Sequence, residues 1–160
     1  MNVARTLTVD EAGLVALAAA LAPALREGGA LYLGGELGAG KTTFARALLR
    51  ALGVGERVKS PTYSLIESYR VGALDIHHLD LYRIADAGEL EWLGLGDLWQ
   101  AGTLLVVEWP ERGAGALPPA DLSLQLAHAG DRRSLSAMPG SARGAAWLRA
   151  WPALAAAPSS

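Results

Sequence analysis

One segment of this 160-residue chain carries a complete phosphate-binding pattern. Residues 35–42, Gly-Glu-Leu-Gly-Ala-Gly-Lys-Thr, match G-x-x-x-x-G-K-[ST] at every fixed position. Glycines let the backbone wrap closely around a phosphate with its N–H groups turned inward. Lys41 supplies a charge that can follow the β- and γ-phosphates, and the Thr42 hydroxyl can ligate Mg²⁺. We therefore expect nucleotide contacts from Gly35, Leu37, Gly38, Ala39, Gly40, Lys41 and Thr42.

A magnesium–phosphate site also needs a carboxylate, usually at the end of a strand. Glu108 ends the apolar run 104–107, which is typical of a buried strand, and Asp80 ends a predicted strand that begins near Ala73. Both can serve, one at the metal and one orienting the attacking water. The alternatives are that Glu108 is a surface acid, and that Asp80 caps a helix or pairs with Arg83.

Several neighbouring residues have two interpretations each. In Ser60-Pro61-Thr62-Tyr63, Thr62 is placed one helix after the phosphate loop, where switch-type hydrolases sense the γ-phosphate, but the segment also suits an ordinary proline turn. Trp109 either packs over the nucleotide or a partner, or fills the core. Arg132 and Arg133 follow a turn, and they either reach the nucleotide or form a solvated pair.

Two further features are less specific. Thr43 either touches the α-phosphate or caps the helix that follows the loop. His77 and His78 are adjacent, so on a strand they point to opposite faces and cannot easily ligate one metal together.

The elements around the loop are those that phosphate binding requires. Residues 30–33 form a short apolar run that predicts a buried strand before the loop. Residues 41–52 predict a helix, with Gly53 placed to end it. The N-terminus of such a helix directs backbone amides and the positive end of its dipole at an anion.

The rest of the chain predicts a mixed sheet with flanking helices. Thr8 is a plausible N-cap, with Glu11 three residues later, for a helix that ends at Gly28. The remaining predicted elements are a hairpin of 64–70 with 73–81, a helix over 89–100, a hairpin of 122–126 with 135–137, and a helix over 141–151. We expect one domain over 1–151 and a disordered tail over 152–160.

Composition excludes several classes of protein. The chain has 14 Lys and Arg residues and 16 Asp and Glu residues, which gives a net charge of −2. This charge argues against a protein that coats nucleic acid by itself. The absence of Cys excludes disulfides, thiol catalysis and iron–sulfur clusters. The longest apolar stretch, 13–25, is interrupted by Pro23 and is shorter than the roughly 20 residues that span a bilayer. We expect a soluble, intracellular protein.

A motif that the chain lacks bears on which nucleotide base it recognises. Guanine-specific switches read the base with an Asn-Lys-x-Asp loop, but Asn2 is the only asparagine. Adenine is therefore favoured. A small-molecule kinase, the alternative function, usually closes a lid with several arginines, whereas the loop 112–119 has only one.

Five motifs in order resemble the bacterial TsaE family, the ATPase of tRNA threonylcarbamoyladenosine biosynthesis. The phosphate loop by itself is generic, whereas its combination with Leu-Asp-Leu-Tyr-Arg and Val-Glu-Trp is quite specific. The motifs are the loop at 35–43, Ser-Pro-Thr-Tyr-Ser-Leu at 60–65, His-Leu-Asp-Leu-Tyr-Arg at 78–83, Glu-Leu-Glu-Trp-Leu-Gly-Leu at 89–95 and Val-Glu-Trp-Pro-Glu at 107–111.

The resemblance implies a cytoplasmic, Mg²⁺-dependent ATPase that is slow alone and stimulated by the TsaB–TsaD pair. That machinery modifies the adenosine at tRNA position 37, so tRNA is reached through partners, with no membrane or DNA partner. The implied fold is a P-loop NTPase-like, three-layer α/β domain with a mixed, partly antiparallel sheet.

The resemblance also implies roles for individual residues. Lys41, Asp80 and Glu108 map to the catalytic group, and Thr42 and Glu108 to the metal contacts. The further nucleotide contacts that it implies are Thr43, Glu11 and a late arginine, taken as Arg132 with Arg133 as the alternative. Trp109 maps to the aromatic residue that follows the acid. Two competing functions remain beside this one: a small-molecule kinase, and a nucleotide-gated binding module with negligible chemistry.

Overall fold

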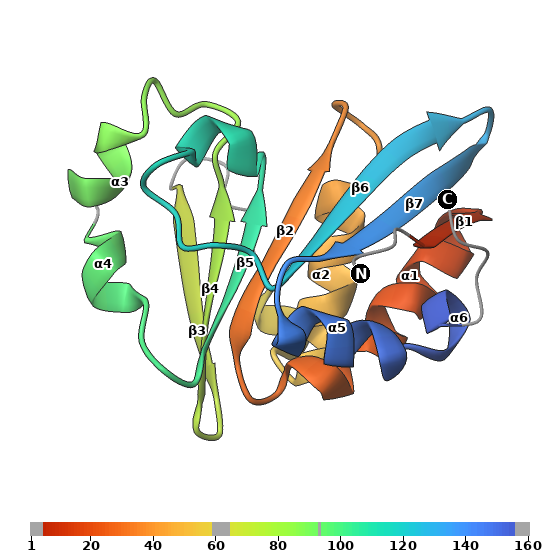
Figure 1. Cartoon of the computed structure of the whole chain (residues 1–160), viewed down its shortest axis with the longest axis horizontal. Helices are drawn as coiled ribbons and strands as arrows, with labels where there is room; N and C mark the ends of the chain where they lie inside the picture. Colours follow the sequence, from red (N-terminus) through yellow and green to blue (C-terminus); the bar gives the residue numbers. More distant parts are fainter. Residues whose placement is uncertain (1–4, 59–64, 93, 156–160) are drawn as a thin grey trace.

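The computed structural model describes residues 5–58, 65–92 and 94–155. Helices cover both faces of a seven-stranded sheet (Figure 1). The strands are β1 (Arg5–Val9), β2 (Gly29–Gly35), β3 (Ile66–Val71), β4 (Leu74–Asp80), β5 (Thr103–Glu108), β6 (Leu122–Ala129) and β7 (Arg132–Pro139). The α-helices are α1 (Glu11–Leu21), α2 (Lys41–Leu52), α3 (Gly88–Trp92), α4 (Leu95–Leu98), α5 (Ala142–Arg149) and α6 (Pro152–Ala155). Short 3₁₀ helices are η1 (Ala22–Leu25), η2 (Gly55–Arg57) and η3 (Pro110–Gly113).

The strand order is β1-β7-β6-β2-β5-β4-β3. β2, β4, β5 and β6 run parallel in the middle, whereas β3 and the β6–β7–β1 arm add antiparallel pairs. Both predicted hairpins are confirmed, and so is the three-layer α/β class with a mixed, partly antiparallel sheet. The parallel register pairs Asp80 with Glu108, and Glu108 with Leu33 of β2. The carboxyl ends of three strands therefore meet at one edge of the sheet.

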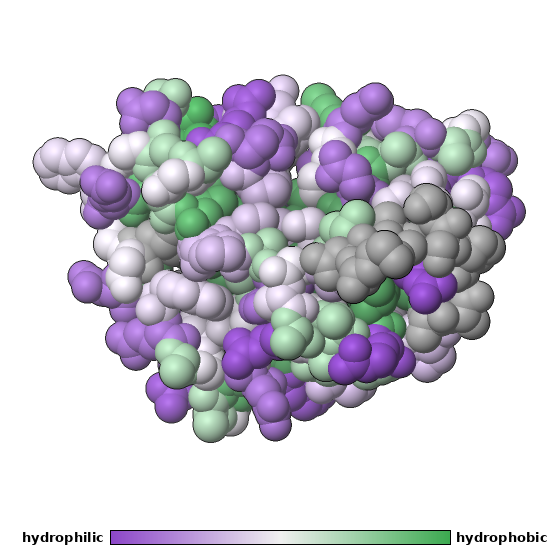
Figure 2. Space-filling model, in the orientation of Figure 1, coloured by the Kyte–Doolittle hydropathy of each residue, from purple (hydrophilic) through white to green (hydrophobic). Residues whose placement is uncertain are grey.

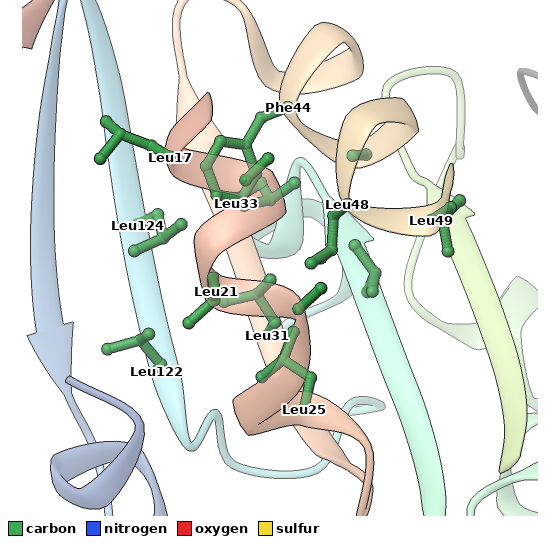
Figure 3. Packing of buried hydrophobic residues seen from close by; sticks show 14 of the residues in the cluster. Leu17, Leu21, Leu25, Leu31, Leu33, Phe44, Leu48, Leu49, Leu122 and Leu124 are labelled. Carbon is green, nitrogen blue, oxygen red and sulfur yellow. The ribbon is translucent and has the colours of Figure 1, made fainter. Parts of the chain in front are cut away.

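The larger core lies between the sheet and the α1–α2 layer (Figure 3). Side chains from α1, α2, β2 and β6 interdigitate there, and alternation along β2 sends Leu31 and Leu33 to this face. The labelled members are Leu17, Leu21, Leu25, Leu31, Leu33, Phe44, Leu48, Leu49, Leu122 and Leu124.

A smaller core covers the opposite face. Ala30 of β2 and Leu105 and Val107 of β5 point to this side and meet Leu90 of α3. Tyr32 packs against the same cluster, and its hydroxyl donates to the carbonyl oxygen of Pro118. Burial raises the pKa of Tyr32 to about 12. The central strands are thus apolar on both faces, as expected for parallel strands under two helical layers.

The start of the chain differs from the prediction. Thr8 is not an N-cap but belongs to β1, which pairs with β7 and was not predicted. Asp10 caps α1 instead, and its carboxylate accepts from the Gly13 N–H at 2.8 Å. The helix gives way to the 3₁₀ turn η1 where Pro23 lacks an N–H. Five alternating residues are too short a pattern to separate a strand from a helix cap.

Two other predictions are corrected. The helix expected over 89–100 is split into α3 and α4, because Gly94 adopts φ 74° between them. The disorder expected from Pro152 is wrong for residues 152–155, which form α6. Leu154 is fully buried, and Trp151 packs on Phe44 with ring centroids 6.2 Å apart. Residues 156–160 lie outside the described residues.

Hydrophilic residues are spread across the face seen in Figure 2, with hydrophobic residues showing between them. Within the described part of the chain, none of the helices has both the length and the apolar character needed to cross a bilayer.

We predict that Leu154→Ala lowers the free energy of unfolding by about 2 to 5 kcal/mol, because it leaves a cavity in a fully buried site. The measurement is urea denaturation followed by circular dichroism. The neighbouring residue Ala153 is exposed, so Ala153→Ser should change stability by less than about 0.5 kcal/mol. Equal stability of the two variants would contradict the packing of α6.

Candidate functional site

The phosphate loop joins the carboxyl end of β2 to the first turn of α2. Its glycines adopt conformations that other residues avoid: Gly35 has φ 132° and Gly40 has φ 109°. A Cβ on Gly35 would overlap the backbone oxygen of Leu126, and one on Gly40 would lie 2.7 Å from Leu14 Cδ2. The loop can therefore take this shape only with glycine at these two positions.

Lys41 begins α2 and is folded back over the loop. Its Nζ donates to the carbonyl oxygens of Gly35 at 2.5 Å and Glu36 at 2.7 Å. Burial lowers the pKa of Lys41, and the carboxylate of Glu108 acts most strongly against that shift. Backbone carbonyls thus hold the ammonium group where a phosphate could exchange with them.

Trp109 covers this lysine. The Lys41 ammonium lies 4.1 Å from the centroid of the indole ring, a cation–π contact. Trp109 has φ 59° and ψ 49°, and it is the one non-glycine with positive φ among the described residues. The indole also contacts Tyr82, with centroids 4.9 Å apart, and the Arg112 guanidinium lies 5.4 Å from the Trp109 ring. An aromatic and cationic wall therefore closes one side of the loop.

Glu108 is the most buried acidic residue of the site, with 1% exposure. Thr42 Oγ1 donates to Glu108 Oε1 at 2.7 Å. The second oxygen, Oε2, lies 2.7 Å from Nε2 of His78, which is fully buried on β4. Because a carboxylate can only accept, Nε2 carries the proton of this bond, and Nδ1 has no hydrogen-bond partner among the described residues. Glu108 is thus held from two sides.

Asp80 ends β4 directly beside Glu108 in the register. Its Oδ1 accepts from the Tyr82 N–H at 3.1 Å. Burial raises the pKa of Asp80, and the Tyr82 hydrogen bond works against that shift. Among the described residues Asp80 forms no ion pair with Arg83, so the hydrogen bond from the local turn at Tyr82 orients this carboxyl group.

A cavity of about 200 Å³ brings most of the predicted residues together. Its lining consists of Leu37, Gly38, Gly40, Lys41, Thr42, Thr43, Asp80, Tyr82, Glu108 and Trp109. Of the two remaining loop residues predicted as contacts, Ala39 is fully buried in the larger core, and Gly35 takes part through its carbonyl oxygen. Thr62 lies outside the described residues.

A second cavity of about 190 Å³ adjoins the first and shares Gly38, Gly40 and Thr43 with it. Glu11 and Arg133 complete its polar lining, together with Asp131. Arg132 does not line either cavity and is exposed. Of the two arginines considered from sequence, only Arg133 therefore lines this cavity, because alternation along β7 turns the two side chains to opposite faces.

The side-chain oxygens beside the phosphate loop suit a hard cation that takes the rest of its ligands from a bound phosphate and from water. The described residues contain no cluster of three His, Cys, Asp or Glu that could enclose a metal. Thr42 Oγ1 and Glu108 Oε1 are adjacent oxygens, of the kind that Mg²⁺ combines with phosphate and water. The residues present therefore fit Mg²⁺ bound together with a nucleotide rather than a metal site built from protein alone.

Sequence reasoning missed three residues of this arrangement: His78, Tyr82 and Arg112. The available signal for His78 was its position two residues before Asp80, which puts both on one face of a strand. The contact with Glu108 also depends on which strand lies beside β4, and that pairing joins residues 30 positions apart. Tyr82 and Arg112 are also 30 positions apart, and they meet where two loops approach each other. Arg112 Nη1 donates to the Tyr82 carbonyl oxygen at 2.5 Å.

We predict that His78→Ala lowers the free energy of unfolding by about 3 kcal/mol, because it removes one of the two side chains that bind the buried Glu108 carboxylate within the described part of the chain. Urea denaturation at neutral pH provides the measurement. A paired variant, His78→Ala with Glu108→Ala, should recover part of the loss. If His78→Ala has wild-type stability, the bond does not support Glu108.

The chain matches the family model for "Threonylcarbamoyl adenosine biosynthesis protein TsaE" over residues 8–135. A tRNA threonylcarbamoyladenosine biosynthesis protein TsaE of Haemophilus influenzae is 44% identical over 105 residues, which is 66% of each chain. The protein of the same name from Bacillus subtilis is 38% identical over 128 residues, covering 79% of this chain and 78% of the relative.

A solved structure has the same fold. The crystal structure of Bacillus subtilis YdiB superposes with a TM-score of 0.74 at 26% identity, covering 96% of this chain and 97% of that one. A model match over most of the chain, two relatives above 30% identity and a full-length structural match lead to one conclusion. This chain belongs to the TsaE family.

Proposed function

We propose that this chain binds ATP and Mg²⁺ and hydrolyses ATP slowly by itself, as a component of the machinery that makes tRNA threonylcarbamoyladenosine. The observation that carries the proposal is the 2.7 Å bond between Thr42 Oγ1 and Glu108 Oε1 beneath the phosphate loop. It joins the helix that binds phosphate to a strand-end carboxylate, which is the pairing that P-loop hydrolases use.

In the proposed hydrolysis, the residues around the phosphate loop have separate roles in the transfer of the γ-phosphate to water. The loop amides and the N-terminus of α2 bind the β- and γ-phosphates. Lys41 exchanges the Gly35 and Glu36 carbonyls for phosphate oxygens and neutralises the charge that develops on them. Thr42 and Glu108 are the residues that would hold Mg²⁺, which would supply positive charge against the charge that develops on the phosphates.

Asp80 serves as the group that positions the attacking water. It lies next to Glu108 at the strand ends and lines the same cavity. Because burial raises its pKa, Asp80 holds a proton more readily than an exposed carboxyl group. It is therefore better suited to orient water and accept a proton late in the reaction than to bind a cation tightly.

The proposed partner is the TsaB–TsaD protein pair, which stimulates hydrolysis. Hydrolysis would then reset a protein–protein complex through a shift between nucleotide-bound states. The proposal includes a cytoplasmic location and contact with tRNA through the partners. The net charge of −2 supports the indirect contact, because tRNA binding by the chain itself would call for a basic surface.

Phosphate release from γ-labelled ATP, with and without the TsaB–TsaD pair, tests the proposal. We expect slow release of free phosphate alone and faster release with the pair. Label on an organic acceptor would instead indicate a small-molecule kinase. ATP binding without release under either condition would indicate a nucleotide-gated binding module, and both outcomes contradict the proposal.

Lys41→Ala should lower ATP turnover by about 100-fold or more, because the ammonium group that stabilises the transferred phosphate is lost. The measurement is phosphate release at saturating ATP, with circular dichroism to confirm folding. Arg143→Ala removes an exposed positive charge on α5 and serves as the matched control, with turnover unchanged. Wild-type turnover in Lys41→Ala would refute the role of the loop.

Asp80→Ala should lower turnover by about 100-fold while reducing the free energy of unfolding by only about 1 kcal/mol. The small stability effect is expected because one backbone hydrogen bond is lost, from Tyr82. Single-turnover phosphate release and thermal melting separate the two quantities. A collapse of the melting temperature with little change in turnover of the folded fraction would show that Asp80 has a structural role.

A further inference from the structure

Trp92 is the most exposed large hydrophobic residue of the described chain, with 91% of its surface open to solvent. The next most exposed is Leu37 of the phosphate loop, at 66%. Tryptophan is among the residues most enriched where proteins bind one another, because one ring supplies a large rigid apolar contact. In Figure 1, α3 stands at one end of the molecule, far from α1 and α6 at the other end.

The chain segment around Trp92 is acidic. Residues 84–99 contain four acidic side chains and no Lys, Arg or His. Glu91 and Asp97 are exposed, while Asp86 and Glu89 accept bonds from the Gly88 and Ala85 N–H groups. We call Trp92 with Glu91 and Asp97 the α3–α4 surface. Apart from residues 84–99, the chain holds 12 acidic and 14 basic residues, so the negative charge is concentrated here.

The opposite side of α3 is fixed to the wall of the nucleotide cavity. Leu90 is fully buried in the smaller core, next to η3. A Cβ on Gly113 would lie 2.9 Å from Leu90 Cδ1, so η3 and α3 approach each other very closely. The N-cap residue directly before η3 is Trp109, which lies over Lys41. Close contacts therefore connect α3 to η3, and Trp109 at the start of this turn contacts the lysine.

We propose that the α3–α4 surface docks into an apolar pocket that is rimmed by Lys or Arg on the stimulating partner protein, with Trp92 as the anchor. This inference rests on the proposed function, in which a protein pair stimulates hydrolysis. Charge complementarity selects that occupant. Nucleic acid is disfavoured because the four carboxylates repel phosphates. A second copy is disfavoured because a two-fold contact would bring the same acidic side chains face to face.

Docking at this surface explains how a partner could raise turnover without entering the cavity. Leu90 and Trp92 lie two positions apart on one short helix, one buried and one exposed. A partner that binds Trp92 restricts the motion of α3. Because Leu90 of α3 packs against η3, the partner also restricts the position of Trp109 over Lys41. The partner therefore favours one arrangement of the lysine, which is a bias between existing states rather than a new catalytic group.

The test compares wild type, Trp92→Ala and Met138→Ala for binding to the TsaB–TsaD pair by calorimetry. Met138 is 42% exposed on β7 and is the matched apolar control. We expect Trp92→Ala to bind about 30-fold more weakly and to lose stimulation, with unchanged ATP turnover alone and an unchanged melting temperature. Met138→Ala should bind like wild type. Asp97→Lys should weaken binding several-fold, and the loss should shrink at high salt.

Other outcomes overturn the inference, and they distinguish it from the proposed function. If the pair binds Trp92→Ala as tightly as wild type, the α3–α4 surface is not the docking site, and the proposed function stands. If wild type does not bind the pair at all, both fail. Self-association that Trp92→Ala removes, measured by sedimentation, would assign the surface to a second copy. Binding of free tRNA that Trp92→Ala abolishes would assign it to nucleic acid.

Discussion

The structure depends on the hydrogen bonds that stabilise one buried carboxylate, that of Glu108. Glu108 lies among central strands with 1% exposure, where an unpartnered carboxylate would be very costly. His78 from the neighbouring strand and Thr42 from the first turn of α2 each bind one of its oxygens. The same bonds that make burial tolerable also lock the strand, the helix and the loop together. Stability and the geometry of the site therefore have one origin.

The parallel centre of the sheet makes that arrangement possible. Parallel strands bring their carboxyl ends to one edge, and here the register aligns Asp80, Glu108 and the start of the phosphate loop. The chain leaves that edge through Trp109, in a left-handed conformation that places the indole over Lys41. From there η3 packs against Leu90 of α3, the short helix that also carries the exposed Trp92.

Much of this could be predicted from local patterns. The glycine and lysine spacing of 35–42, the helical stripe of α2 and the two hairpins depend on residues close together in sequence, so periodicity and turn signals suffice. The failures are also local in origin. β1 is five residues long, and Gly94 interrupts a helical pattern, so tertiary pairing and backbone conformation outweighed weak propensity. Leu154 was missed because a tail rich in alanine has no pattern that indicates burial.

By itself, then, the sequence determined the residue types of the loop, and it correctly placed Asp80 and Glu108 at the ends of two strands. It could not decide what each would contact. Strand order is set by packing between segments far apart in the chain, and that order alone gave Glu108 its bond to His78. Likewise, Arg133 rather than Arg132 lines the second cavity, because the pairing of β7 determines which face of the strand turns toward the loop. The sequence pattern shows that side chains alternate between the two faces of a strand, but only the assembled sheet shows which face lies toward the phosphate loop.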